Sequence, residues 1–166
     1  MEFAQWLSKT ALSTAIQNNS NWLWPACESL HFLGLSVLVG ATGVFDFRLM
    51  GFLKGMSLKA AWNLMPWAIV GFGINLLTGL IFLTGEPVQY YRNPTWWYKA
   101  AFLVVAGVNA LVFQVAMADK VGTIGAGQDT PFSFKLVGAV SLIAWFGVLY
   151  FGRMLPFLTP STLSGV

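Results

Sequence analysis

The 166-residue chain is 57% hydrophobic and only 9% charged, and its net charge is +3. A soluble domain carries about 25% charged residues, so this chain cannot cover a water-exposed surface with charge, and we expect lipid as its solvent. The small positive excess does not indicate nucleic-acid binding, because a few Lys and Arg residues mark the loops of membrane proteins. The length allows one domain, so we assign residues 1–166 to a single membrane domain.

The first expected element covers residues 2–18. Apolar residues recur there every four positions, at Phe3, Leu7, Ala11 and Ala15. This spacing predicts an N-terminal amphipathic helix that lies in the membrane interface instead of crossing the bilayer. The Asn-rich stretch 18–21 is expected to end it, and Pro25 suits the first turn of the next helix.

Four long uncharged stretches follow, and each is near the roughly 20 residues that a helix needs to cross a bilayer. They predict spanning helices at about 25–50, 60–85, 98–118 and 135–155. In the second stretch, Ser57 is the expected N-cap, and Pro66 either kinks the helix or begins the span proper. The apolar runs are continuous and do not alternate as barrel strands do. The expected fold is an all-α integral membrane four-helix bundle.

The basic residues give a small orientation bias. Five of them fall on the face of the first and third connections and four on the other face. Positive charge marks the cytoplasmic side, so we expect both termini outside, on the periplasmic side of a bacterial inner (cytoplasmic) membrane. The Gly-rich connection 119–134 is then expected to be a mobile inside loop.

The only histidine, His31, lies near the outer end of the first span, with Cys27 and Glu28 close by. Residues three or four apart are neighbours on a helix, so both can act with His31. A neutral imidazole there can ligate haem iron, bind copper or hydrogen-bond a quinone, with Glu28 accepting the other ring N–H. The alternatives are a His–Glu hydrogen bond that closes a helix pair, and a proton or ion path. Cys27 and His31 alone do not complete a structural metal site, and Cys27 equally suits a small buried apolar position.

A membrane haem b also needs a second axial ligand on another helix. Met154, at the outer end of the fourth span, is the methionine expected nearest the level of His31. The sequence therefore leaves haem b and quinone open as cofactors.

Other polar residues lie within the predicted spans or at their ends. Asp46 follows Glu28 by 18 residues, about five helical turns, so the two are expected to project from one face at opposite ends of the first span. Arg48 is expected to anchor the helix end by extending toward lipid phosphates. Amides within the second and third spans are expected to join helices, at Asn75, Asn109 and Gln114. Two small-xxx-small pairs suggest close helix approach, Ser36/Gly40 and Ala106/Ala110.

Several segments together carry a family resemblance: Trp24-Pro25, Glu28 to Gly34, Phe45 to Gly51, Met65 to Phe72, and Lys99 to Phe113. They resemble a family of short, uncharacterised bacterial four-helix inner-membrane proteins that contain a domain of unknown function. An outer His followed by a Gly-rich half-helix is also distantly similar to copper-resistance D and cytochrome b561-type bundles. In the short family the third helix tends to end in Phe-His, whereas this chain has Phe113-Gln114. That departure weakens a haem role and favours a structural or quinone-contact role.

The leading functional hypothesis is an accessory or anchor subunit of a respiratory-type membrane electron-transfer assembly that contacts haem b or quinone through His31. One alternative is a small oligomeric transporter or ion-coupled carrier with Glu28, His31 and Asp46 on its path. Another is a purely structural lipid-binding module. The expected partners are the lipid bilayer and either other membrane subunits or further copies of the chain. No nucleophile–base pair, phosphate loop or metalloprotease signature is present, so we expect no catalytic activity of the chain on its own.

Overall fold

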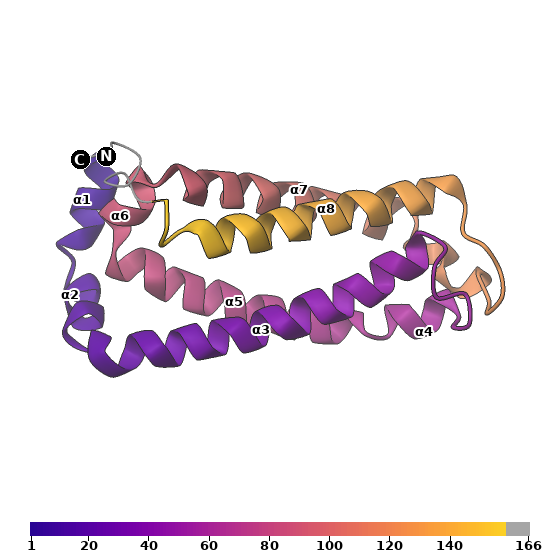
Figure 1. Ribbon diagram of the computed structural model, residues 1–166, viewed down its shortest axis with the longest axis horizontal. Helices are drawn as coiled ribbons and strands as arrows, with labels where there is room; N and C mark the ends of the chain where they lie inside the picture. The colour runs from indigo at the N-terminus through magenta and orange to yellow at the C-terminus, as the bar shows by residue number, and fades with distance from the viewer. Residues whose placement is uncertain (159–166) are drawn as a thin grey trace.

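The computed structural model describes residues 1–158, and helices make up all the regular structure in that range (Figure 1). In chain order they are α1 (Glu2–Ser8), α2 (Ala11–Asn18), α3 (Ser20–Leu49), α4 (Leu58–Trp62), α5 (Met65–Gly85), α6 (Pro87–Arg92), α7 (Pro94–Ala116), the 3-10 helix η1 (Ala118–Thr123) and α8 (Phe132–Met154). Within residues 1–158, four helical segments are long and apolar enough to cross a membrane: α3, α4 with α5, α7, and α8. The expected all-α membrane bundle is confirmed, and the chain is a multi-pass membrane protein by the length and composition of its helices.

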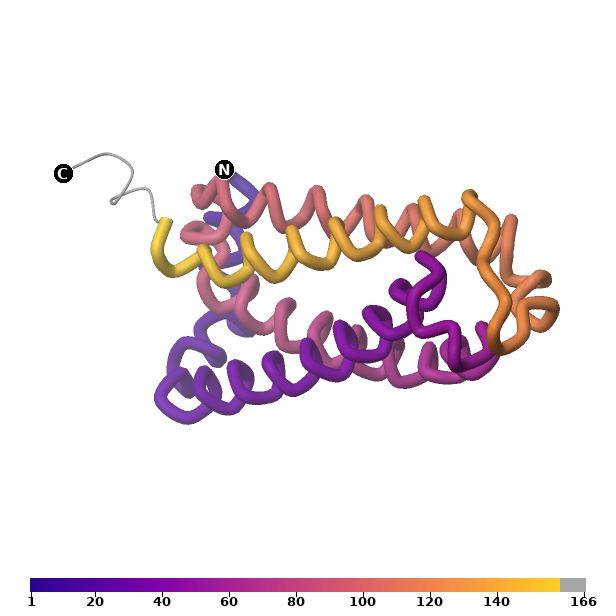
Figure 2. Tube along the Cα trace, turned by 45° about the vertical axis from the view of Figure 1, so that its right-hand side comes forward, coloured from indigo at the N-terminus to yellow at the C-terminus, as the bar shows by residue number. Residues whose placement is uncertain are grey.

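The four spans form two helical hairpins. Helix α3 packs along α5, and α7 packs along α8. The hairpins meet through α3 and α8 at the end that carries α4 and η1, here termed the loop end (Figures 1 and 2). They diverge toward the opposite end, which carries α1, α2 and α6 and is here termed the N-terminal end.

Close contact of α3 with α5 depends on two glycines. A Cβ added at Gly71 would lie 2.6 Å from the Gly34 carbonyl oxygen and 2.7 Å from the Leu38 nitrogen. Only the absence of side chains at both positions lets the two backbones approach this closely. The predicted small-xxx-small pair Ser36/Gly40 does not make such a contact, because Ser36 is exposed and a Cβ at Gly40 would meet no atom within 4 Å.

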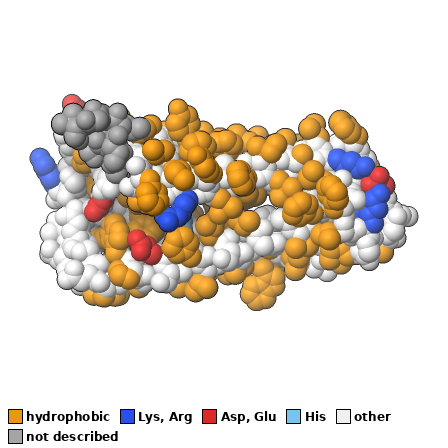
Figure 3. Space-filling view, in the orientation of Figure 1, with side chains coloured by type: hydrophobic (Ala, Val, Ile, Leu, Met, Phe, Trp, Pro, Cys, Tyr) orange, Lys and Arg blue, Asp and Glu red, His pale blue; other side chains and the backbone are white. Residues whose placement is uncertain are grey.

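Apolar side chains cover most of the outer surface along the bundle, while most charged side chains on the visible face lie toward its ends (Figure 3). In each spanning helix, only 11–33% of the most apolar 18-residue window is buried inside the protein. The exposed apolar side chains on α7 include Val104, Val108, Leu111 and Val115. A surface of this kind is suited to lipid or to other membrane subunits.

The N-terminal segment differs from the single interfacial helix expected over residues 2–18. It forms two helices, because Thr10 accepts a hydrogen bond from the Ser13 N–H and caps α2. The buried face consists of Ala4, Ser13 and Ile16, whereas Phe3 of the expected apolar stripe is 69% exposed. Helix α2 packs against α5, and Gln17 Nε2 donates to the Gly85 carbonyl at 2.8 Å.

Some span boundaries also differ from expectation. Helix α3 begins at Ser20, five residues before Pro25, so the Asn-rich stretch interrupts the helix only at Asn19. Ser57 caps α4 as expected, with its hydroxyl accepting from the Ala60 N–H at 3.2 Å. Pro66 lies at the start of α5, where its missing N–H costs no helical hydrogen bond. Helix α7 begins earlier than expected, at Pro94, because the Asn93 side chain accepts from the Thr95 N–H.

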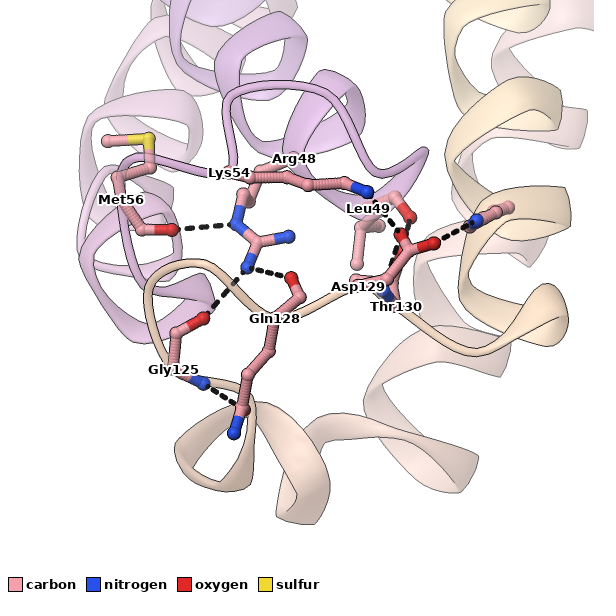
Figure 4. Close-up of polar contacts among 9 residues, drawn as sticks. Arg48, Leu49, Lys54, Met56, Gly125, Gln128, Asp129 and Thr130 are labelled. Carbon is pink, nitrogen blue, oxygen red and sulfur yellow. Dashed lines mark hydrogen bonds and ion pairs between the residues drawn. The ribbon is translucent and has the colours of Figure 1, made fainter.

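The connection 119–134 was expected to be mobile, but Arg48 holds it at Gly125 and Gln128 (Figure 4). Arg48 is fully buried and donates to three backbone carbonyls, those of Met56 at 2.8 Å, Gly125 at 3.0 Å and Gln128 at 3.0 Å. The expectation that Arg48 extends to lipid phosphates was therefore wrong. A guanidinium at a helix end binds the acceptors that are nearest. Here these are backbone carbonyls of the connection between α3 and α4 and of the connection between η1 and α8.

Asp129 joins the same connection to the spans, since it pairs with Lys135 at 2.9 Å and with Lys54 at 3.5 Å. The hydrogen bond from Lys135 and that from the Thr130 N–H lower the pKa of Asp129 to about 2. A depressed carboxyl pKa adds stability above the unfolded-state value near 4, and this contribution is lost as pH falls through about 2.

We therefore expect the stability difference between the wild type and Asp129→Asn to shrink as pH falls from 5 to 2. Thermal unfolding in detergent at several pH values measures it. A difference that stays constant over this range would show that the Asp129 ion pairs do not contribute to stability.

Candidate functional site

The candidate site centres on His31, which lies on α3 and faces α5. Its Nδ1 lies 2.7 Å from the Thr78 hydroxyl oxygen, and its ring packs edge-on against Phe82 with 5.7 Å between ring centroids. The helical spacing that places Gly34 against Gly71 also brings His31 beside Thr78 and Gly79. The α3–α5 contact thus fixes the orientation of the imidazole.

The hydrogen bonds of Thr78 indicate which ring nitrogen carries the proton. The Thr78 hydroxyl donates to the Ile74 carbonyl at 2.8 Å, as threonines in apolar helices commonly do. With that proton in use, Thr78 acts as the acceptor, and we assign the donor N–H to His31 Nδ1. The other nitrogen, Nε2, then carries a lone pair and has no partner among residues 1–158.

Lys99 of the second hairpin brings a cation toward His31. Its ammonium is near enough to act electrostatically on the His31 ring, and its side chain packs beside Gly152 of α8. Lys99 is partly buried, yet no described residue forms a hydrogen bond or an ion pair with it. One hairpin thus contributes an imidazole with only one ring nitrogen hydrogen-bonded, and the other contributes an unpaired ammonium whose charge acts on that ring through space.

The other residues predicted around His31 are not joined to it. Glu28 is exposed and forms no hydrogen bond with the ring, whose Nδ1 is bound by Thr78 instead. Cys27 is buried as a free thiol. No contact in the described structure links Met154 to His31, and residues 1–158 contain no group of three or more His, Cys, Asp or Glu side chains that could hold a metal ion.

Asp46 lies at a different interface from His31. It is 3% exposed and faces α8, with its side chain near Ser141. A Cβ added at Gly138 would lie 2.8 Å from the Asp46 carbonyl oxygen, so α8 covers Asp46 closely. Its Oδ2 is buried without a partner in the described structure. Glu28, 18 residues earlier on the same helix, is exposed while Asp46 is enclosed between α3 and α8, so the two do not lie in one buried seam.

The three amides behave differently from one another. Asn109 joins two helices, since its Nδ2 donates to the Val137 carbonyl of α8 at 3.1 Å. Asn75 instead donates within α5, to the Gly71 carbonyl at 2.9 Å, and its buried Oδ1 has no described partner. Gln114 is exposed at the far end of α7 and is not part of the site.

Two contributors to the site, Thr78 and Lys99, were not predicted from the sequence. Thr78 was visible as a hydroxyl in an apolar helix, but it lies 47 residues from its partner His31. Lys99 was named only as the first residue of a segment that carries the family resemblance. Its position about one turn inside a spanning helix was the signal that could have marked it as a functional residue, because a charge there costs free energy.

Over residues 4–158 the chain matches the model of a family of unknown function, DUF6644. No curated protein and no solved structure matches it.

Proposed function

Because the chain belongs to DUF6644, a family of unknown function, we propose a function from its own residues: it is a membrane subunit that binds a quinol or quinone beside His31. In this proposal it serves as an accessory subunit of an electron-transfer assembly in a bacterial inner membrane. Its N-terminal end faces the periplasm, which the five-to-four distribution of basic residues favours.

The observation that carries the proposal is that only one of the two ring nitrogens of His31 has a hydrogen-bond partner in the described structure. Thr78 fixes Nδ1 at 2.7 Å, which leaves the Nε2 lone pair to accept a hydrogen bond from a quinol hydroxyl. The unpaired Lys99 ammonium can donate to a ring oxygen of the same ligand. A polar head held in this way leaves its isoprenoid tail to lie along the exposed apolar helices.

An imidazole with a free lone pair could also ligate haem iron, so the first measurement has to separate the two cofactors. An absorption spectrum of protein purified with its native lipids and partners, before and after dithionite, does this. The proposal predicts no reduced b-haem band that depends on His31.

We expect a short-chain quinol to raise the thermal midpoint of the purified protein by about 5 °C at a concentration well above its dissociation constant. His31→Gln should abolish this shift because it removes the acceptor nitrogen, and Thr78→Val should reduce it because the ring loses its orientation. Gln114→Ala is the matched control, since Gln114 is exposed and remote from His31.

An equal shift in wild type and His31→Gln would contradict the proposed quinol contact. The accessory role is tested separately, by purification from native membranes in mild detergent. Absence of any subunit that carries a redox cofactor would contradict that role.

A further inference from the structure

A second feature, separate from His31, lies at the N-terminal end of the bundle. It is a cleft of about 160 Å³ to which both hairpins contribute. Its walls come from the start of α3, from α6 with its flanking residues, and from the residues after α8: Trp24, Glu28, Glu86, Gln89, Tyr90, Asn93, Leu155 and Pro156. On the face drawn in Figure 3, acidic side chains lie at this end of the molecule.

The walls of the cleft are fixed by hydrogen bonds and by ring packing. Asn93 is 2% exposed, and it donates to the Leu155 carbonyl at 2.9 Å while accepting from the Thr95 N–H. Trp24 packs edge-on against Phe82, with 5.3 Å between centroids, and lies against Gly85. These contacts fix the positions of the residues that line the cleft.

The cleft carries negative charge that the described protein does not neutralise. Glu28 and Glu86 both line it, and neither forms a hydrogen bond or an ion pair through its side chain with residues 1–158. Burial and the charges of Glu86 and Glu28 raise the pKa of Tyr90 to about 12, so its phenol stays neutral at physiological pH. Arg153, at the end of α8, lies over the Phe157 ring at 4.9 Å.

Two carboxylates beside the rings of Trp24 and Tyr90 make a surface that favours an organic cation. Carboxylates accept charge-assisted hydrogen bonds from an ammonium, and aromatic faces attract the same charge. The volume corresponds to about five water molecules at roughly 30 Å³ each, which suits a small head group and not a drug-sized ligand. Gln89 adds an exposed amide that can also accept from a primary ammonium.

The position of the cleft identifies the source of the ammonium. Glu86 directly follows α5 and the cleft lies at the ends of the spans, next to aromatic side chains of the 90–98 region. Trp and Tyr gather where helices meet lipid head groups. We infer that this cleft binds the primary ammonium of an aminophospholipid head group, with the acyl chains against the apolar helices. The inference does not depend on the proposed quinol site.

The experiment compares lipids that differ only in the head group. The protein is delipidated in detergent and then offered equal amounts of phosphatidylethanolamine, phosphatidylcholine and phosphatidylglycerol of identical chains, and the bound lipid is counted by native mass spectrometry. We expect phosphatidylethanolamine to be retained preferentially, and Glu28→Gln with Glu86→Gln to reduce its retention about tenfold. Glu2→Gln is the matched control, because it removes an exposed carboxylate from the same end without touching the cleft.

Three outcomes would overturn the inference: equal retention of the ethanolamine and choline lipids, unchanged retention in the double variant, or the same loss in Glu2→Gln. A separate arm adds free ethanolamine to lipid-free protein. If this soluble amine raises the thermal midpoint as strongly as the lipid does, the cleft binds a soluble amine and the lipid assignment is wrong. Circular dichroism confirms folding, and the single Glu86→Gln variant replaces the double variant if the latter does not fold.

Discussion

We expect Arg48→Met to lower the free energy of unfolding by about 3 kcal/mol and to release both connections at the loop end. Arg48 is 0% exposed; its Nε donates to the Met56 carbonyl and its Nη2 to those of Gly125 and Gln128, while Nη1 has no partner in the described structure (Figure 4). A methionine of similar length fills much of the space but leaves these acceptors without a donor. Each unsatisfied buried group costs about 1–3 kcal/mol, and water that reaches the connections recovers part of this loss.

Two measurements check the effect of Arg48→Met. Thermal or denaturant unfolding in detergent gives the stability change, and limited proteolysis reports the opening of the connections at 50–57 and 124–131. Lys59→Met is the matched control, because Lys59 is an exposed cation at the same end and should change stability by less than about 0.5 kcal/mol. Cleavage of Arg48→Met at the wild-type rate would contradict the role of Arg48 in holding the two connections.

The second large effect is expected at the crossing of α3 and α5, where Gly71→Ala should destabilise the protein by about 2–3 kcal/mol. The new methyl group would lie 2.6 Å from the Gly34 oxygen, 2.7 Å from the Leu38 nitrogen and 3.1 Å from the Leu38 Cα. These are backbone atoms, which cannot rotate away as a side chain can. The helices must therefore separate, and the His31–Thr78 hydrogen bond near this crossing should weaken with them.

The chain provides a close control for this substitution two residues along the same helix. A Cβ at Gly73 would meet no atom within 4 Å, so Gly73→Ala should be neutral or up to about 1 kcal/mol stabilising, as alanine favours helix. Unfolding in detergent measures both variants, and the imidazole nitrogen resonances report on His31. Similar effects of the two substitutions would indicate that the close approach of α3 and α5 does not limit stability.

Local features of the sequence determined the main elements of the fold. The length of each apolar run predicted four spans, because a helix must carry an apolar surface over the whole hydrocarbon thickness. Ser57 and Pro66 marked the start of α4 and of α5, since capping and the missing proline N–H act within one helical turn. The boundaries at Ser20 and Pro94 were missed, because Pro25 was taken as a start and Asn93 was not recognised as a cap.

Arg48 shows where local reasoning fails. The sequence indicated a basic residue at the end of a spanning helix, for which lipid phosphate is the usual partner. Its actual partners include the carbonyls of Gly125 and Gln128, 77 and 80 residues further along the chain. The packing of the second hairpin on the first decides whether these carbonyls or lipid phosphates lie nearer to the Arg48 guanidinium.

For the candidate site too, the sequence determined one part and the tertiary structure the other. The sequence by itself determined that His31 is an ionisable group within an apolar helix, because burying such a group without a role costs free energy. Only the tertiary structure decided that Thr78 of α5 holds Nδ1 and that Lys99 of α7 approaches the ring. The close α3–α5 contact at Gly34 and Gly71, and the divergence of the two hairpins, depend on which helix faces meet. Apolar periodicity cannot specify this in a chain whose helices are apolar on nearly every side, so the partners of each polar group emerge only when the helices pack.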